Sequence, residues 1–168
     1  MRLALFLVLL CCFTGTARAL DGVSFEAGRG DENTDLWRIG LQWRWDKRWL
    51  EAGGWHLGAY WDVQLGQWNN GHDVTDVSLT PVFRYQRSSG DVIPYVEGAI
   101  GFHMLSEHRI TTGRVFSTRF QFGDHLGAGV AFGPHDIGFR LQHVSNGGIA
   151  RPNPGINFFV LRYQYRFD

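Results

Sequence analysis

The sequence has 168 residues, with 16 basic and 16 acidic side chains, thirteen Phe, seven Trp and two Cys. Its length suits one domain. The even charge balance gives no reason to expect nucleic acid as a partner. Both cysteines, Cys11 and Cys12, lie in a segment that we expect to be removed. Their loss would exclude disulfides and thiol chemistry from the mature chain.

The first residues are typical of a secretory signal peptide. Arg2 supplies a positive charge, residues 3–13 form an apolar run, and small residues around Arg18 offer a cleavage point after Ala19. The apolar run is too short for a membrane-spanning helix, which needs about 20 residues. We therefore expect a signal peptide at 1–19 and a single mature domain at 20–168. The mature domain would keep 14 basic and 16 acidic residues, a net charge of −2.

Apolar and polar residues then alternate with a period of two, which predicts β-strands rather than helices. In residues 37–45 every odd position is large and apolar, and every even position is Arg, Gly or Gln. The same alternation recurs along the chain. It predicts eight strands, near residues 23–27, 37–45, 55–65, 77–86, 95–104, 120–132, from 137 onward, and 159–167.

The two faces of these strands differ in charge. The interior of an eight-stranded barrel is only wide enough for side chains, so a network of charges that neutralise one another can fill it. The bulky apolar face would then contact lipid. We predict an all-β, eight-stranded antiparallel transmembrane β-barrel of the outer-membrane type. The alternative, a soluble lipocalin-like barrel with its apolar face inward, also fits the alternation. The polar face carries Glu26, Arg38, Arg44, Asp62, Arg84, Glu97, Arg140, Arg162 and Arg166.

Aromatic residues and turns suggest how the barrel sits in the membrane. Aromatics near strand ends, among them Phe116, fit the interfacial girdles of outer-membrane barrels. We expect short turns at 88–91 and 133–136, and longer polar connections after the first, third, fifth and seventh strands, as at 28–35 and 106–115. Because short turns are usually periplasmic, both termini are expected in the periplasm.

Polar residues interrupt the lipid-facing stripe where the seventh strand ends. His143 and Ser145 are two apart, so they share one face, and Asn157 at the start of the eighth strand shares it too. Polar groups facing lipid are costly unless they have a use. A serine becomes a nucleophile when a nearby histidine takes its proton. From spacing alone, however, ordinary interfacial residues remain the favoured interpretation.

The wider pattern favours chemistry. His143-Val-Ser-Asn-Gly-Gly followed by Pro-Asn-Pro-Gly-Ile at 152–156 resembles the lipid A 3-O-deacylase (PagL) family, and residues 120–127 are similar to its sixth strand. The resemblance covers essentially the whole mature chain. It implies a hydrolase, with no cofactor or metal, that removes the ester-linked acyl chain at position 3 of lipid A. It further implies Ser145 as nucleophile and His143 as general base. The residues that match the family's oxyanion site are Asn146, Gly148 and Asn153.

One position departs from the family pattern, because Asn157 stands where the family has Glu. An amide oxygen can orient an imidazole but cannot stabilise imidazolium as a carboxylate does. In a serine protease, the corresponding change costs about 10⁴ in kcat. No acidic residue lies between Asp136 and Asp168, so the sequence shows no nearby substitute. Two outcomes stay open: a slow Ser-His-Asn esterase, or a member that has lost the chemistry.

The expected partners are lipid A or lipopolysaccharide as substrate and the bacterial outer membrane as location, and a homodimer is left open. The loop cations available to meet the substrate phosphates are Arg29, Arg109, Arg114 and Arg151. One rival function is a non-catalytic structural or adhesive barrel. Another is a lipid A palmitoyltransferase-type barrel, whose family carries an amphipathic helix before its first strand. Here the first predicted strand begins almost at the cleavage point.

Overall fold

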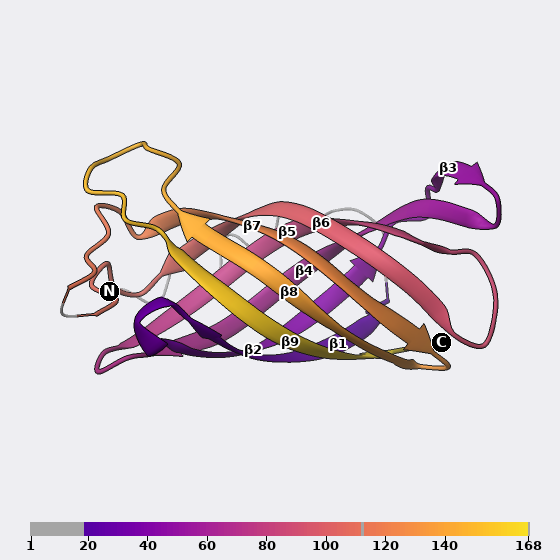
Figure 1. Ribbon diagram of the computed structural model, residues 1–168, viewed down its shortest axis with the longest axis horizontal. Helices are drawn as coiled ribbons and strands as arrows, with labels where there is room; N and C mark the ends of the chain where they lie inside the picture. The colour runs from indigo at the N-terminus through magenta and orange to yellow at the C-terminus, as the bar shows by residue number, and fades with distance from the viewer. Residues whose placement is uncertain (1–18, 112, 168) are drawn as a thin grey trace.

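Eight long antiparallel strands close into a barrel in the computed structural model, which describes residues 19–111 and 113–167 (Figure 1). Neighbouring strands pair in chain order, and the β1–β9 and β2–β4 pairings complete the ring. The wall consists of β1 (Gly22–Gly30), β2 (Asp35–Arg44), β4 (Trp55–Asn69), β5 (Asp73–Arg87), β6 (Ile93–Leu105), β7 (Phe120–Phe132), β8 (His135–Ser145) and β9 (Ile156–Arg166). A 3₁₀ turn, η2 (Asp31–Asn33), joins β1 to β2. The expected signal peptide falls on residues that are almost all outside the described part of the chain, and it stays a prediction.

All eight predicted strands are present, and one further strand was not predicted. This short strand, β3 (Trp49–Ala52), pairs with β4 and projects beyond one end of the barrel (Figure 1). Within the described residues, no helix is long and apolar enough to cross a bilayer.

The expected contrast in loop length is only half right. The first and third connections are short turns, at 31–34 and 70–72, rather than long loops. The connection between β2 and β4, at 45–54, is instead extended by β3. The two long connections at the end that carries His143 and Ser145 are 106–119 and 146–155. The placement of the termini in the periplasm therefore depends on these two loops, and it remains a prediction.

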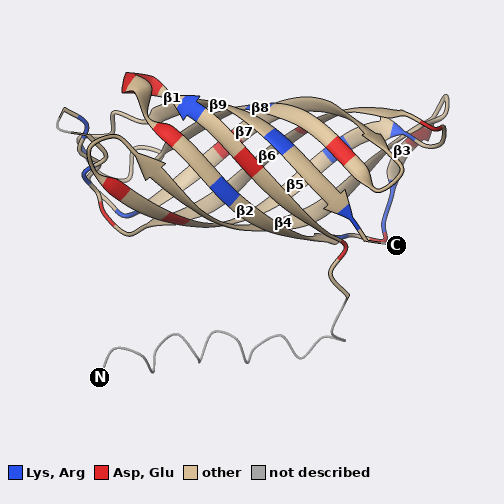
Figure 2. Cartoon of the chain, turned by 90° about the horizontal axis from the view of Figure 1, so that it is seen from below, with Lys and Arg blue, Asp and Glu red and all other residues tan. Residues whose placement is uncertain are grey.

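The polar face points inward, as the charge pattern predicted. Apolar side chains cover the outer wall; Leu126, for example, is 72% exposed to solvent in the isolated chain. Only lipid tolerates such a continuous apolar surface, so the inverted, lipocalin-like arrangement is excluded for these strands. Figure 2 shows residues of both signs along the middle of the strands as well as at their ends. Four arginines and five carboxylates are buried inside: Arg38, Arg84, Arg140, Arg162, Glu26, Asp62, Asp76, Glu97 and Asp136.

Two arginines that we expected inside lie elsewhere. Arg44 and Arg166 belong to the inward-facing set by parity, but they are the last residues of β2 and β9. The Arg44 side chain is 58% exposed and bonds Asp21 at the barrel end. Parity thus predicts the face of a residue, whereas depth along the strand decides whether it is enclosed.

The buried charges neutralise one another, as expected. Arg140 donates hydrogen bonds to Glu26 at 2.6 Å, to Glu97 at 2.8 Å and to Asp62 at 3.2 Å. Strand register supplies further contacts, because Glu26 lies opposite Arg38 on β2 and bonds it at 2.7 Å. Buried ions are tolerated when they are paired and hydrogen-bonded. This network fills the middle of the barrel.

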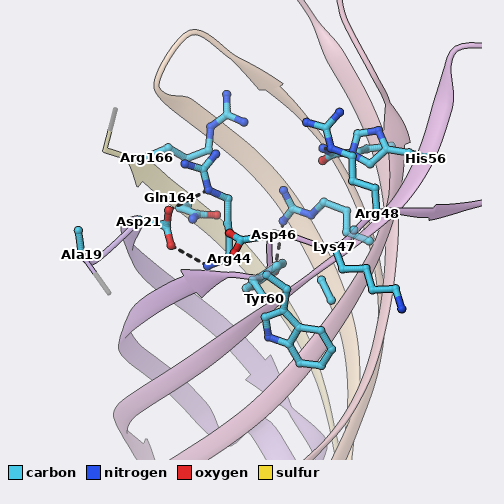
Figure 3. A pocket seen from close by; sticks show the side chains of 15 residues that line it. Ala19, Asp21, Arg44, Asp46, Lys47, Arg48, His56, Tyr60, Gln164 and Arg166 are labelled. Atoms are coloured by element: carbon cyan, nitrogen blue, oxygen red, sulfur yellow. Dashed lines mark hydrogen bonds and ion pairs between the residues drawn. The ribbon is translucent and has the colours of Figure 1, made fainter. Parts of the chain in front are cut away.

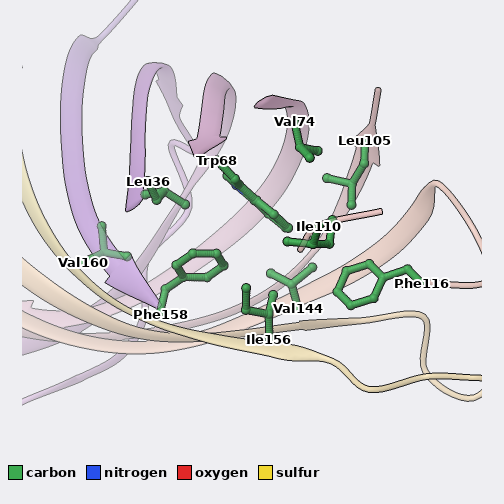
Figure 4. Close-up of a cluster of buried hydrophobic side chains, with 10 residues drawn as sticks. All are labelled: Leu36, Trp68, Val74, Leu105, Ile110, Phe116, Val144, Ile156, Phe158 and Val160. Atoms are coloured by element: carbon green, nitrogen blue, oxygen red, sulfur yellow. The ribbon is translucent and has the colours of Figure 1, made fainter. Parts of the chain in front are cut away.

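An apolar cluster closes the barrel at the end that carries the long loops (Figure 4). Ile110 and Phe116 come from the 106–119 connection, which turns back through hydrogen bonds from Ile110 N to Arg114 O at 2.9 Å and from Phe116 N to His108 O at 2.7 Å. Phe116 is 1% exposed, so its predicted role in an interfacial girdle is wrong. The cluster comprises Leu36, Trp68, Val74, Leu105, Ile110, Phe116, Val144, Ile156, Phe158 and Val160.

Candidate active site

Strand register aligns four polar residues in a row across the outer wall. On β8, His143 lies opposite Asp124 of β7 and opposite Asn157 of β9. On the far side of β9, Gly30 of β1 pairs with Phe158, so the next residue, Asp31, faces Asn157. The row therefore crosses four neighbouring strands or strand ends in the order Asp124, His143, Asn157 and Asp31. It lies just below the rim from which the 146–155 loop leaves.

The histidine and the asparagine are joined as the sequence pattern predicted. His143 Nδ1 lies 2.8 Å from Asn157 Oδ1. Ser145 is the last residue of β8 and, being two residues further along, shares the outer face of His143. Both side chains are partly exposed rather than buried. The Asn157 amide thus orients the imidazole through Nδ1, and the other ring nitrogen, Nε2, lies beside Gly155.

A glycine makes room for this arrangement. Gly155 has φ +60°, a left-handed conformation that side chains disfavour. A Cβ added there would lie 2.6 Å from His143 Cε1 and 3.5 Å from Ser145 Cβ. The imidazole and the serine therefore flank one point. Although no hydrogen bond links them within the described residues, such catalytic contacts often tighten only when substrate binds.

The three residues matched to the oxyanion site lie together in the 146–155 loop, and they bond one another. Asn146 is fully buried, and its backbone N–H donates to Asn153 Oδ1 at 3.0 Å. Its Nδ2 donates to Ala150 O at 2.9 Å, and its Oδ1 accepts the Gly148 N–H at 2.9 Å. The structure brings Asn146, Gly148 and Asn153 together in one loop, but the donors Asn146 Nδ2 and Gly148 N–H already have partners there.

One acid that contacts Asn157 was not predicted from the sequence. Asp31 Oδ2 accepts hydrogen bonds from the Asn157 backbone N–H at 3.0 Å and from Asn157 Nδ2 at 3.1 Å. The expectation that no substitute acid lies nearby is therefore wrong in space, although it holds along the chain. Asp31 comes from the β1–β2 turn, far from the motif in sequence.

Asp124 was also overlooked, although the sequence carried a signal for it. It stands on the apolar face of β7 between Phe122 and Leu126, where a lipid-facing strand should have no charge. Only the β7–β8 register shows that it lies beside His143. A charge that interrupts an apolar stripe is therefore worth treating as a candidate site residue.

Two of the proposed phosphate-binding cations are already paired with carboxylates. Arg29 bonds Asp35 at 2.9 Å. Arg114 bonds Glu32 at 3.0 Å, lies 3.5 Å from Asp31, and donates to Gly155 O. Arg114 therefore ties the 106–119 connection to both sides of the candidate site. Its visible role is to hold these loops together.

Cavities at the two ends of the barrel differ in character. One of about 410 Å³ lies over the row of polar residues, with Leu126, Leu141 and Phe159 on its apolar side beside His143 and Asn157. The other, of about 490 Å³, lies at the opposite end and is lined by charged side chains such as Asp21, Arg44, Lys47 and Arg48 (Figure 3). An acyl chain is compatible with the first and not with the second.

A closed barrel with an apolar outer wall, interrupted by a serine beside an oriented histidine, defines an outer-membrane ester hydrolase. The family model "Lipid A 3-O-deacylase (PagL)" matches residues 36–166. The chain belongs to this lipid A 3-O-deacylase family. Its membership argues against the palmitoyltransferase-type barrel considered from the sequence.

Relatives support this membership over nearly the full length. The chain is 32% identical to the lipid A deacylase PagL of Pseudomonas aeruginosa, over 96% of this chain and 95% of that protein. It is 36% identical to the lipid A deacylase PagL of Bordetella bronchiseptica, over 94% of this chain and 90% of that protein. The crystal structure of the outer membrane enzyme PagL matches with a TM-score of 0.82 and 31% identity, over 87% of this chain and 99% of that one. De novo designed transmembrane β-barrels share the fold alone, with a TM-score of 0.55 and 16% identity.

Proposed function

We propose that this outer-membrane lipid A 3-O-deacylase uses Ser145 as its nucleophile, His143 as general base and Asn157 as the residue that orients His143. The observation that carries the proposal is the 2.8 Å contact between His143 Nδ1 and Asn157 Oδ1, made on the lipid-facing wall beside Ser145. With Nδ1 engaged, Nε2 is the nitrogen left to take the serine proton. Lipid A reaches this wall by diffusion within the outer leaflet, and its acyl chain lies along the apolar side of the cavity.

The reaction then proceeds in two balanced halves. Ser145 Oγ attacks the carbonyl carbon of the 3-O-linked ester while His143 Nε2 takes the hydroxyl proton. Collapse of the tetrahedral intermediate breaks the bond to the sugar oxygen, which receives that proton and leaves as an alcohol. Water, deprotonated by His143, attacks the acyl-enzyme and releases the fatty acid. Ser145 recovers its proton, so no other reactant is consumed.

Oxyanion stabilisation would come from the loop that follows Ser145. Asn146 Nδ2 and the Gly148 N–H are two of the matched donors, and both bond acceptors within the loop. To hold the oxyanion they would exchange these acceptors for the substrate oxygen. Asn153 would act indirectly, by fixing the Asn146 backbone. A single donor of this kind typically contributes about 10²–10³ in kcat.

Mass spectrometry of lipid A from cells that express the protein tests these roles. Wild type should release one 3-hydroxyacyl chain, and Ser145→Ala and His143→Asn should leave lipid A intact at equal amounts of folded barrel. Unchanged lipid A with abundant folded wild type would favour a member that has lost the chemistry. Activity that survives Ser145→Ala would overturn the assignment of the nucleophile.

A homodimer stays a prediction alongside this function. The apolar outer wall is already accounted for by lipid, so it does not by itself indicate a subunit interface. Chemical crosslinking in native membranes, followed by denaturing gel electrophoresis, tests the prediction. A crosslinked species at twice the monomer mass would support it, and monomer alone at full crosslinker reactivity would contradict it.

A further inference from the structure

We propose that Asp31 supplies, through Asn157, the negative charge that the family's Glu provides directly, so that the site works as a Ser145-His143-Asn157-Asp31 relay. The inference rests on the proposed roles of Ser145 and His143. Asp31 is a positioning residue, because it contacts Asn157 and not the reacting atoms. The contact that carries the inference is the 3.1 Å hydrogen bond from Asn157 Nδ2 to Asp31 Oδ2.

The first consequence of this contact is the orientation of the asparagine. A carboxylate can only accept hydrogen bonds, so the group that faces Asp31 must be the NH₂ of Asn157. The amide oxygen is then turned to the other side, toward His143 Nδ1. Without Asp31, the amide could turn over and present its NH₂ to the imidazole. The Asn157 backbone N–H, which also bonds Asp31 Oδ2 at 3.0 Å, fixes the start of β9 in the same position.

The second consequence is the tautomer of His143. The Asn157 oxygen is an acceptor, so His143 Nδ1 must carry the proton, and Nε2 keeps the lone pair that a general base needs. When Nε2 takes the serine proton, the imidazolium is stabilised by the amide dipole, which points its negative end at the ring. The Asp31 carboxylate at the far end of the amide adds to this dipole. A neutral Asn157 alone would orient the ring without this charge.

The position of Asp31 is itself well determined. Within the β1–β2 turn, Thr34 donates to Asp31 O from its backbone N–H at 3.1 Å and from its hydroxyl at 2.8 Å. Glu32 and Asn33 adopt left-handed conformations, with φ +56° and +61°, which make the turn tight. Arg114 Nη1 lies 3.5 Å from Asp31 Oδ2, the same oxygen that accepts the hydrogen bonds from Asn157. The turn thus delivers the carboxylate to the end of β9 with little freedom.

Exchanging the two residues tests the relay. Asp31→Asn keeps an acceptor oxygen and removes the charge, so we expect kcat on purified lipid A to fall roughly 10–100-fold with KM unchanged, as for other partners one bond removed from a functional group. Asn157→Asp would set two carboxylates against each other about 3 Å apart, and it should also be impaired. The double variant Asp31→Asn/Asn157→Asp restores one charge and one amide, now with the acid directly on His143. It should be at least tenfold faster than either single variant.

A matched control uses a similar contact elsewhere on the same rim. Asn69 Nδ2 donates to Asp73 Oδ1 at 2.6 Å in the β4–β5 hairpin, away from His143. Asp73→Asn should leave kcat unchanged, and folding of every variant is checked by heat-dependent gel mobility. Equal rates for wild type and Asp31→Asn would overturn the relay, as would a double variant no faster than the single ones. A loss confined to Asp124→Asn would assign the acid to β7 instead. Inactive Ser145→Ala, in any of these cases, leaves the proposed function standing.

Discussion

Replacing Arg140 by Met should destabilise the barrel more than any change on its surface, because Arg140 lies at the centre of the buried charge network. Its side chain is 2% exposed and bonds Glu26, Asp62 and Glu97. The described interior holds four arginines against five carboxylates. The substitution would leave three buried arginines against five buried carboxylates, with a side chain of similar size at position 140. Breaking a buried pair by removing one partner typically costs about 3–5 kcal/mol.

The measurement is urea unfolding of the purified protein in lipid vesicles, followed by tryptophan fluorescence. Arg29→Met is the matched control, because the Arg29–Asp35 pair is 64% and 59% exposed. Exposed pairs contribute about 0–1 kcal/mol. Adding Asp62→Asn to Arg140→Met should recover part of the loss, since Arg140 is the only arginine paired with Asp62 within the described residues, and the second change removes the charge left unpaired. Equal unfolding free energies for the Arg140 and Arg29 variants would refute the description of the interior as a sealed ionic network.

Four further outcomes are expected. Gly155→Ala should lower kcat by about 10²-fold, because its Cβ would displace the His143 imidazole, and a misplacement of that order has this effect; an unchanged rate would contradict the geometry. Asn146→Ala should reduce kcat by about 10²–10³ if its amide serves the oxyanion, as measured on purified lipid A. Phe116→Ala should lower the unfolding free energy by about 3–5 kcal/mol in the same urea assay. Hydrogen bonds from the Thr111 hydroxyl and from the Arg114 guanidinium lower the pKa of Glu32 from 4.5. The contacts of Glu32 with Thr111 and Arg114 should therefore hold the 106–119 connection to the β1–β2 turn above pH 4.5 and weaken as the pH falls below that value. Hydrogen exchange of the backbone amides in the connection measures this change. In the Glu32→Gln variant these amides should exchange rapidly at all pH values.

Strand positions and sidedness could be predicted because both follow from local alternation. In residues 37–45 the charges occupy one parity, and a narrow lumen is the place where they neutralise one another. The short β3 escaped prediction, since four residues carry little periodicity and Leu50 within it has φ +52°. The inward turn of the 106–119 connection was also missed. Phe116 is buried in an apolar cluster with residues of β2, β4, β5, β6, β8 and β9, and these residues meet only after the barrel has closed.

The site was predictable where the motif was contiguous. His143, Ser145 and Asn157 were assigned from their spacing and from the family resemblance, and the structure places them on one face. Asp31 was not predictable in this way, because it is 126 residues from Asn157 along the chain. Finding it requires the β1–β9 register, which depends on how the first and last strands meet when the ring closes. The motif around His143 and Ser145 therefore gave no indication that a carboxylate, that of Asp31, contacts Asn157.

Because Ser145 is the last residue of β8, its hydroxyl lies between an apolar environment on the strand side and a polar environment on the loop side. Toward the strand, the neighbouring side chains are those of a surface immersed in fatty-acid tails, from which a scissile ester can slide sideways into place. Toward the loop the chain turns polar, and in the proposed mechanism the water for the second half of the reaction arrives from this side. If the serine lay several residues deeper in β8, the acyl-enzyme would be surrounded by hydrocarbon, and its hydrolysis would be slow because water is scarce there.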